Sequence, residues 1–82
     1  MFHIYAISSE IKNYIYVGMS EDVEKRVLRH NSGREKTTRP YKPFKLIFTE
    51  CVSADRKEVR KREKYWKSGI GKEKLRNIRD NQ

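Results

Sequence analysis

Cysteine is nearly absent from this chain of 82 residues, and proline and glycine are scarce, with two and four copies. The single cysteine, Cys51, can form neither an intrachain disulfide nor a zinc site built on paired cysteines. Its simplest interpretation is a half-buried strand residue of a protein in a reducing cytoplasm. The sequence is thus unlike that of a disulfide-stapled secreted domain.

Long hydrophobic runs are also missing. No apolar stretch approaches the ~20 residues that a transmembrane helix needs. The first residues, Met1–Tyr5, lack the basic region of a secretion signal. No helix-like segment combines a wide apolar face with aromatic anchors, so a membrane surface is not the expected partner either.

Acidic residues are outnumbered, since 20 lysines and arginines face 11 aspartates and glutamates, which gives a net charge of +9. This excess favours nucleic acid or an acidic protein as the partner. Charged residues (38%) exceed hydrophobic ones (35%), a balance that permits disorder. Three compact apolar runs and the many aromatic residues nevertheless favour a folded chain. At this length we expect one domain over residues 1–82, with a thin core.

Residues 2–19 have the pattern of a β-hairpin. Apolar residues alternate over Phe2–Ile7, a polar, turn-like segment covers Ser8–Asn13, and Tyr14–Met19 is predicted as the second strand. With antiparallel pairing in the obvious register, Tyr5 and Tyr16 lie on the same face of the sheet.

A bend and a helix are expected after the hairpin. Gly18 allows a sharp turn, and the hydroxyl of Ser20 can cap a helix over Glu21–His30. Arg26 and His30 are four residues apart and therefore share one face of this helix.

The rest of the chain is predicted to supply a third strand and two helices. Arg34–Pro43, which contains both prolines, is expected to be an exposed loop, and Phe44–Val52 a strand. A long helix is predicted over Ala54–Ser68, capped by Ser53, and a last short helix over Lys72–Asn77.

The long helix carries a carboxylate in an unusual place. Val59, Trp66 and Ile70 have helical spacing and form its core-facing stripe. Glu63 lies inside that stripe, where a partly desolvated carboxylate is costly without a partner. The partner can be a nearby cation, since the helix also contains Arg56, Lys57, Arg60, Lys61, Arg62, Lys64 and Lys67. Alternatively, Glu63 is a ligand of Mg²⁺, which often takes only one or two protein carboxylates.

Five side chains stand out as candidates for a site: Tyr5, Tyr16, Arg26, His30 and Glu63. Each also has an ordinary structural interpretation, as hairpin aromatics, a solvated helix face or an ion pair. Their joint spacing favours a common site.

In this spacing the sequence resembles the GIY-YIG nuclease family. The name motif appears as His3-Ile4-Tyr5 followed by Tyr16-Val17-Gly18, and the helix that follows resembles the family's arginine motif running into His30-Asn31-Ser32-Gly33. Arg39-Pro40 and the run from Arg60 to Lys64 are also family-like. The resemblance covers nearly the whole chain. It is nearest to small single-domain bacterial members related to the nuclease module of the excision-repair endonuclease, which points to DNA repair.

The resemblance implies an α+β fold in which helices flank a three-stranded antiparallel sheet. It also implies hydrolysis of DNA phosphodiester bonds with one divalent cation, Mg²⁺ or Mn²⁺. By position, Glu63 matches the metal-binding glutamate and Arg26 the arginine that neutralises phosphate. Tyr5 and Tyr16 match the two motif tyrosines, and His30 matches an active-site histidine of some members.

On these assignments Tyr5 is expected to orient or deprotonate the attacking water. That role requires a neighbouring cation or metal to lower a phenol pKa of about 10. Tyr16 is expected to hold the phosphate or to assist Tyr5, and His30 is an alternative proton shuttle.

The sequence also departs from the family pattern. His3 stands where the name motif has glycine, and Met19 where the repair relatives often carry lysine. Asn77 matches a C-terminal asparagine of some members. We expect no specificity domain beside these motifs, so binding to the DNA backbone is expected to be largely non-specific and strongly salt-dependent.

Two other interpretations remain open. One is a basic nucleic-acid-binding module of the same fold that has lost efficient cleavage. The other is an accessory protein that docks to an acidic partner through its basic helix. RNA is not excluded as a substrate, and the sequence leaves the oligomeric state open.

Overall fold

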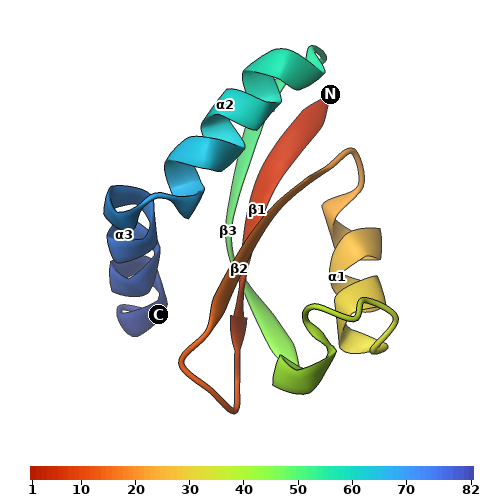
Figure 1. The fold of residues 1–82 in the computed structure, drawn as a ribbon, viewed down its shortest axis with the longest axis vertical. Helices are drawn as coiled ribbons and strands as arrows, with labels where there is room; N and C mark the ends of the chain where they lie inside the picture. Colours follow the sequence, from red (N-terminus) through yellow and green to blue (C-terminus); the bar gives the residue numbers. More distant parts are fainter.

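A three-stranded antiparallel sheet organises the computed structural model, which describes residues 1–82 (Figure 1). The strands are β1 (Phe2–Ser9), β2 (Ile15–Ser20) and β3 (Phe44–Ser53), in the spatial order β2–β1–β3. The helices are α1 (Val23–Asn31), α2 (Arg56–Lys67) and α3 (Gly69–Asp80), with one 3₁₀ turn, η1 (Arg39–Tyr41), ahead of β3. The expected α+β fold is thus confirmed. None of the helices has the length and apolar character needed to span a bilayer.

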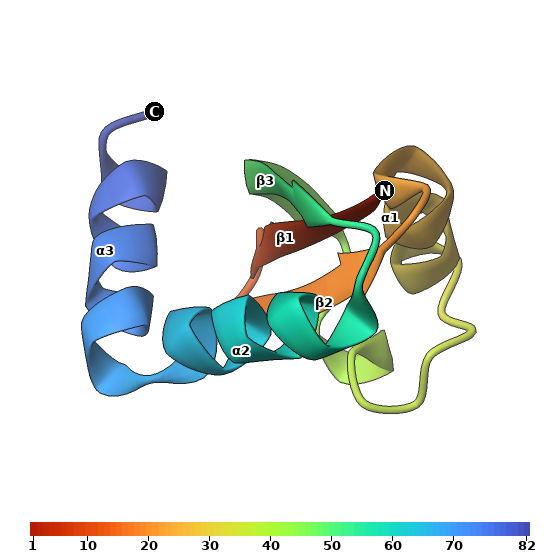
Figure 2. The same ribbon diagram turned by 90° about the horizontal axis from the view of Figure 1, so that it is seen from above.

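Alternation along the strands divides the core between the two faces of the sheet. One face carries the larger cluster, which consists of Ile4, Ala6, Ile15, Val17, Ile47, Val59, Trp66 and Leu75. These residues join the sheet to α2 and α3. Tyr5, Ile7 and Phe44 form the core of the opposite face, where Tyr16 packs beside them under α1. Figure 2 shows α1 and α3 on opposite sides of the sheet, and the shared face of the two motif tyrosines is as expected.

Helix α1 begins two residues later than predicted. Its N-cap is Asp22, whose carboxylate accepts a hydrogen bond from the amide of Lys25 at 3.1 Å. The expected cap, Ser20, is the last residue of β2, and its hydroxyl instead binds the backbone N–H and C=O of Asp22. The predicted bend at Gly18 is also wrong, because β2 continues straight through it.

The chain turns again between α2 and α3. Ser68 ends α2, and its hydroxyl accepts a hydrogen bond from the amide of Gly71 in the first turn of α3. This turn restarts the helical phase, so Ile70, predicted as part of the core-facing stripe, is 66% exposed. Leu75 is fully buried instead. Val59 and Trp66, the other two members of the predicted stripe, are buried as expected.

An ion pair joins α2 to the edge strand β3. The guanidinium of Arg62 donates two hydrogen bonds to the carboxylate of Glu50, at 2.9 and 2.8 Å. These bonds hold the pKa of Glu50 below its ordinary value. Cys51, the next residue, is exposed rather than half-buried.

The ring of Tyr5 lies over Gly18, its partner across the β1–β2 ladder. A Cβ built on Gly18 would lie 2.6 Å from the Tyr5 hydroxyl oxygen and 2.7 Å from its ring carbon Cζ. Both distances are far inside normal contact. Glycine is therefore needed here for the close approach of a tyrosine and not for a bend.

Gly18→Ala is expected to lower the free energy of unfolding by about 1–3 kcal/mol, because the added methyl group must displace a buried ring. Gly69→Ala is the control, since nothing lies within 4 Å of a Cβ at that position. Urea unfolding followed by circular dichroism measures both variants. A Gly18→Ala protein as stable as the wild type would show that the Tyr5 ring does not rest on Gly18.

Candidate active site

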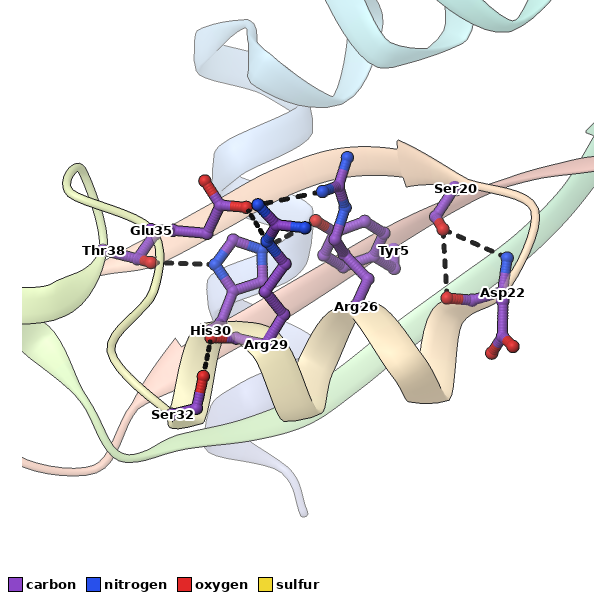
Figure 3. A network of polar contacts seen from close by, with 9 residues as sticks. All are labelled: Tyr5, Ser20, Asp22, Arg26, Arg29, His30, Ser32, Glu35 and Thr38. Atoms are coloured by element: carbon purple, nitrogen blue, oxygen red, sulfur yellow. Dashed lines mark hydrogen bonds and ion pairs between the residues drawn. The ribbon is translucent and has the colours of Figure 1, made fainter.

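A chain of two hydrogen bonds lies between α1 and the sheet (Figure 3). The hydroxyl oxygen of Tyr5 is 2.8 Å from Nε2 of His30, and Nδ1 of His30 is 2.8 Å from Oγ1 of Thr38. All three residues are buried, with exposed fractions of 1%, 2% and 0%. Strand β1, helix α1 and the segment before η1 each contribute one residue, so three distant parts of the chain meet at His30.

Burial sets the protonation of these groups. It raises the pKa of Tyr5 above its ordinary value, and the opposing effect of Arg26 does not compensate. Burial lowers the pKa of His30, so its imidazole is neutral at pH 7. A neutral imidazole has one N–H, so either Tyr5 donates to Nε2 and Nδ1–H donates to Thr38, or both directions are reversed. Arg26 alone therefore does not make Tyr5 acidic, and in the free protein the Tyr5 hydroxyl stays protonated.

Tyr16 lies beside this chain and nearer the surface. Its ring centroid is 4.9 Å from that of His30 and 6.3 Å from that of Tyr5. The residue is only partly buried, and its hydroxyl makes no hydrogen bond within the protein. Of the two motif tyrosines, Tyr16 is thus the one whose hydroxyl is free to meet a ligand.

Two arginines of α1 converge on one carboxylate. Oε1 of Glu35 lies 2.7 Å from Nε of Arg29 and 3.4 Å from Nη1 of Arg26. The charges of Arg26 and Glu35 both act on the Tyr5 hydroxyl, which lies on the same side of α1 (Figure 3). Guanidinium groups bind phosphate with the same geometry as carboxylate. Glu35 therefore occupies a position that an anionic ligand can take.

The segment 34–43 is largely exposed, as predicted, but two of its side chains contact α1. Thr38 is fully buried against His30, and Glu35 is held by α1. Successive turns shape the segment, with the amides of Thr38 and Arg39 both donating to the carbonyl of Glu35. Sequence reasoning missed both side chains. A lone acid in a basic loop after a helix with two arginines was a usable signal for Glu35, whereas nothing in the sequence marks Thr38.

Glu63 lies in the other layer of the fold. Helix α2 packs on the face opposite α1, and the Glu63 side chain is 22% exposed. Its ionic partner is Lys67, one turn later, whose Nζ is 3.4 Å from Oε2. The charge of Glu63 nevertheless acts on the Tyr5 hydroxyl and helps to raise its pKa. The structure brings the other four predicted site residues together and places Glu63 within electrostatic reach of Tyr5, with no hydrogen bond or ion pair to any of the four.

Glu63 contributes a single carboxylate as a possible ligand of a cation. Nowhere do three side chains of the usual metal-binding kinds, His, Cys, Asp or Glu, come together. Glu63 has one loose ion pair at Oε2, and no contact engages its Oε1. Mg²⁺ is commonly held by one or two carboxylates, with water and substrate phosphates completing its shell. The donor set therefore fits a cation that binds together with phosphate and does not fit a structural metal.

Two residues noted in the motif comparison lie outside this cluster. His3 is on the same face as Tyr5, two residues before it, and its Nδ1 is buried without a hydrogen-bond partner. Asn77 is an exposed residue of α3, and its carbonyl accepts hydrogen bonds from Asn81. The Asn77 side chain makes no hydrogen bond, so no contact links it to the cluster around His30.

Comparisons with known proteins identify relatives of this chain. A family model described as the GIY-YIG catalytic domain matches residues 1–77. A UPF0213 protein of Bacillus licheniformis is 35% identical over 79 residues, which cover 95% of this chain and 80% of the relative. The UPF0213 protein YazA of Bacillus subtilis is 36% identical over 73 residues, covering 88% and 73% of the two chains. No solved structure matches.

Acidification is expected to weaken the fold through His30. The pKa of this group is lower in the folded protein than its ordinary 6.5, so between the two values the unfolded state binds a proton that the folded state does not. The free energy of unfolding therefore falls as the pH is lowered from about 7.5 through this window. Urea unfolding at several pH values measures the slope, which His30→Gln is expected to reduce. Equal slopes in the two proteins would show that folding does not bury a neutral His30.

Proposed function

This chain belongs to the GIY-YIG family, and we propose that it is an endonuclease that hydrolyses phosphodiester bonds of DNA with one divalent cation. Membership of a nuclease family implies a nucleic-acid substrate. The observation that carries the proposal is the hydrogen bond between Tyr5 and His30 beside Arg26. It combines a pair of groups able to move a proton with a cation able to hold a phosphate.

Substrate binding begins at Arg26. Its guanidinium can fork onto two non-bridging oxygens of a phosphate. A phosphate that replaces the Glu35 carboxylate on this arginine comes to lie near the Tyr5 hydroxyl. Charge that builds on the phosphate during hydrolysis strengthens its contact with Arg26, so the residue stabilises the transition state more than the ground state.

Proton transfer follows the buried hydrogen bonds. As water attacks phosphorus, a new P–O bond forms, the bond to the leaving oxygen breaks, and that oxygen takes up a proton from solvent. The proton lost by the water passes to the oxygen of Tyr5 while the Tyr5 proton moves to Nε2 of His30, which accepts it in the neutral tautomer that carries its proton on Nδ1. Tyr5 thus relays a proton without being a phenolate beforehand, and Nδ1–H of His30 still donates to Thr38.

Two further residues complete the proposed site. Glu63 is the residue that would hold Mg²⁺ or Mn²⁺, and the bound cation would stabilise charge on the phosphate and leaving oxygens. Tyr16, with its hydroxyl free beside His30, is proposed to donate a hydrogen bond to the phosphate.

A nucleic-acid-binding module without efficient cleavage is the second candidate function. It is favoured by the burial of Tyr5, whose hydroxyl is covered in the free protein.

Supercoiled plasmid incubated with pure protein and Mg²⁺, Mn²⁺ or a chelator separates the two functions. Nicking that requires the cation supports the nuclease, whereas retarded mobility without nicking supports the module. A labelled RNA run in parallel decides between the two nucleic acids.

Glu63→Gln is expected to reduce cation-dependent nicking by at least about a hundredfold, because the amide lacks the charge that attracts the cation. Affinity for DNA in chelator should stay within about twofold of the wild type, since Glu63 makes no phosphate contact of its own. Glu58→Gln, also on α2 and exposed, is the control. Nicking that survives in Glu63→Gln would rule out Glu63 as the metal ligand.

Glu35→Gln is expected to tighten DNA binding by about threefold to tenfold, because a neutral amide competes less well with phosphate for Arg26 and Arg29. Glu24→Gln removes the same charge from an exposed position of α1 and controls for the change in net charge. Fluorescence anisotropy with a labelled duplex in chelator measures both. An equal gain in the two variants would mean that Glu35 does not compete with the substrate.

A further inference from the structure

A second group of arginines lies at the end of β2. They form the arginine hollow, a space of about 390 Å³ lined by Phe2, Met19, Ser20, Glu21, Arg26, Arg56 and Arg60. Arg26 comes from α1, whereas Arg56 and Arg60 come from α2. The sheet separates these two helices over most of its area, so the arginine hollow is a place that both layers of the fold reach.

The two arginines that α2 contributes to the arginine hollow are not neutralised by an ion pair. Neither Arg56 nor Arg60 forms an ion pair, whereas Arg62 on the same helix is neutralised by Glu50. The guanidinium of Arg56 lies over the ring of Phe2, 5.3 Å from its centroid, and this contact restrains it at the hollow. Glu21 is the one acidic residue among the lining side chains. Arg26 is also paired with Glu35, so the positive charge of the hollow comes mainly from Arg56 and Arg60, which exceed the single carboxylate of Glu21.

The arginine hollow continues into a second basic depression on α1. Ser20, Asp22, Lys25, Arg26 and Arg29 line that depression. Ser20 and Arg26 belong to both, so Arg26 lies between the cations of α1 and those of α2. An extended polyanion that crossed the end of β2 would meet positive charge on both sides of Arg26.

We propose that the arginine hollow binds the sugar–phosphate backbone of a nucleic-acid strand next to the phosphate held by Arg26. This inference rests on the proposed function, because it takes Arg26 to mark the cleaved phosphate. The strand then runs from α1 past the end of β2 onto α2. Arg60 and Glu63 are three residues apart on α2 and therefore neighbours on its surface. A strand bound at Arg60 passes close to the proposed metal ligand.

Paired substitutions on α2 test the proposal. Arg56→Gln combined with Arg60→Gln removes the two arginines from the hollow, and Lys57→Gln combined with Lys61→Gln removes equal charge from exposed positions of α2 outside it. The arginine pair is expected to weaken binding of a labelled DNA duplex about tenfold at about 100 mM salt. It should also reduce the slope of log K against log salt by about 1–2, whereas the lysine pair should cost less than about threefold.

Nicking kinetics give the second readout. Contacts to a flanking phosphate are made equally in the ground and transition states, so the arginine pair should raise KM while kcat stays within about twofold. Equal weakening by both pairs would mean that only the general positive field matters, and it would overturn the proposal. Unchanged binding in the arginine pair, or a fall in kcat alone, would overturn it as well.

The two proposals fail in different ways. A wild-type protein that nicks DNA, with an arginine pair that binds as well as the wild type, leaves the nuclease standing and removes the arginine hollow. A wild-type protein that never nicks but loses affinity selectively in the arginine pair keeps the hollow as a backbone-binding site and removes the nuclease. A wild type that binds neither DNA nor RNA overturns both.

Discussion

The hydrogen bond between Tyr5 and His30 is the interaction on which the rest of the site depends. A phenol and an imidazole are both costly to bury unless their polar atoms are bonded. Here the Tyr5 hydroxyl satisfies Nε2 of His30, and Thr38 satisfies Nδ1. Gly18 accommodates the tyrosine ring by having no side chain. One buried contact therefore explains a glycine in β2, a threonine in the loop and a histidine at the end of α1.

The positive charge of this protein falls into two classes. Some cations are used internally, as in the pairing of Arg62 with Glu50, which joins α2 to β3. Others, Arg56 and Arg60 among them, have no carboxylate partner although they lie near one another. Unpaired like charges in one place destabilise a free protein, a cost that is understandable where an anion is bound. Arg26 belongs between these two classes. Its partner, the carboxylate of Glu35, is shared with Arg29, so the charge of Arg26 is only partly neutralised.

Sequence periodicity predicted the hairpin and the shared face of Tyr5 and Tyr16, since side chains on paired strands alternate strictly. It failed where the cause is not local. Gly18 resembles a turn residue until the ring of Tyr5, across the ladder, is placed above it. In the sequence, the helical spacing of apolar residues continues through Ile70, but in the structure the turn at Ser68 interrupts the helix. The protonation of Tyr5 could not be predicted either, because it depends on burial by segments far away in the sequence.

The strand order explains how a carboxylate from one layer can act in the other. β2 is an edge strand of six residues, so no further strand extends the barrier between α1 and α2 beyond it. The Tyr5 hydroxyl lies over this edge strand, because its neighbour is Gly18. Glu63 stands on the core-facing stripe of α2 yet keeps part of its side chain in solvent, and its charge reaches that hydroxyl. If β2 were an interior strand, the sheet would shield Glu63 from the phenol and would keep the arginines of the two helices apart. The position of β2 at the edge is therefore the structural condition for any chemistry that uses both helices.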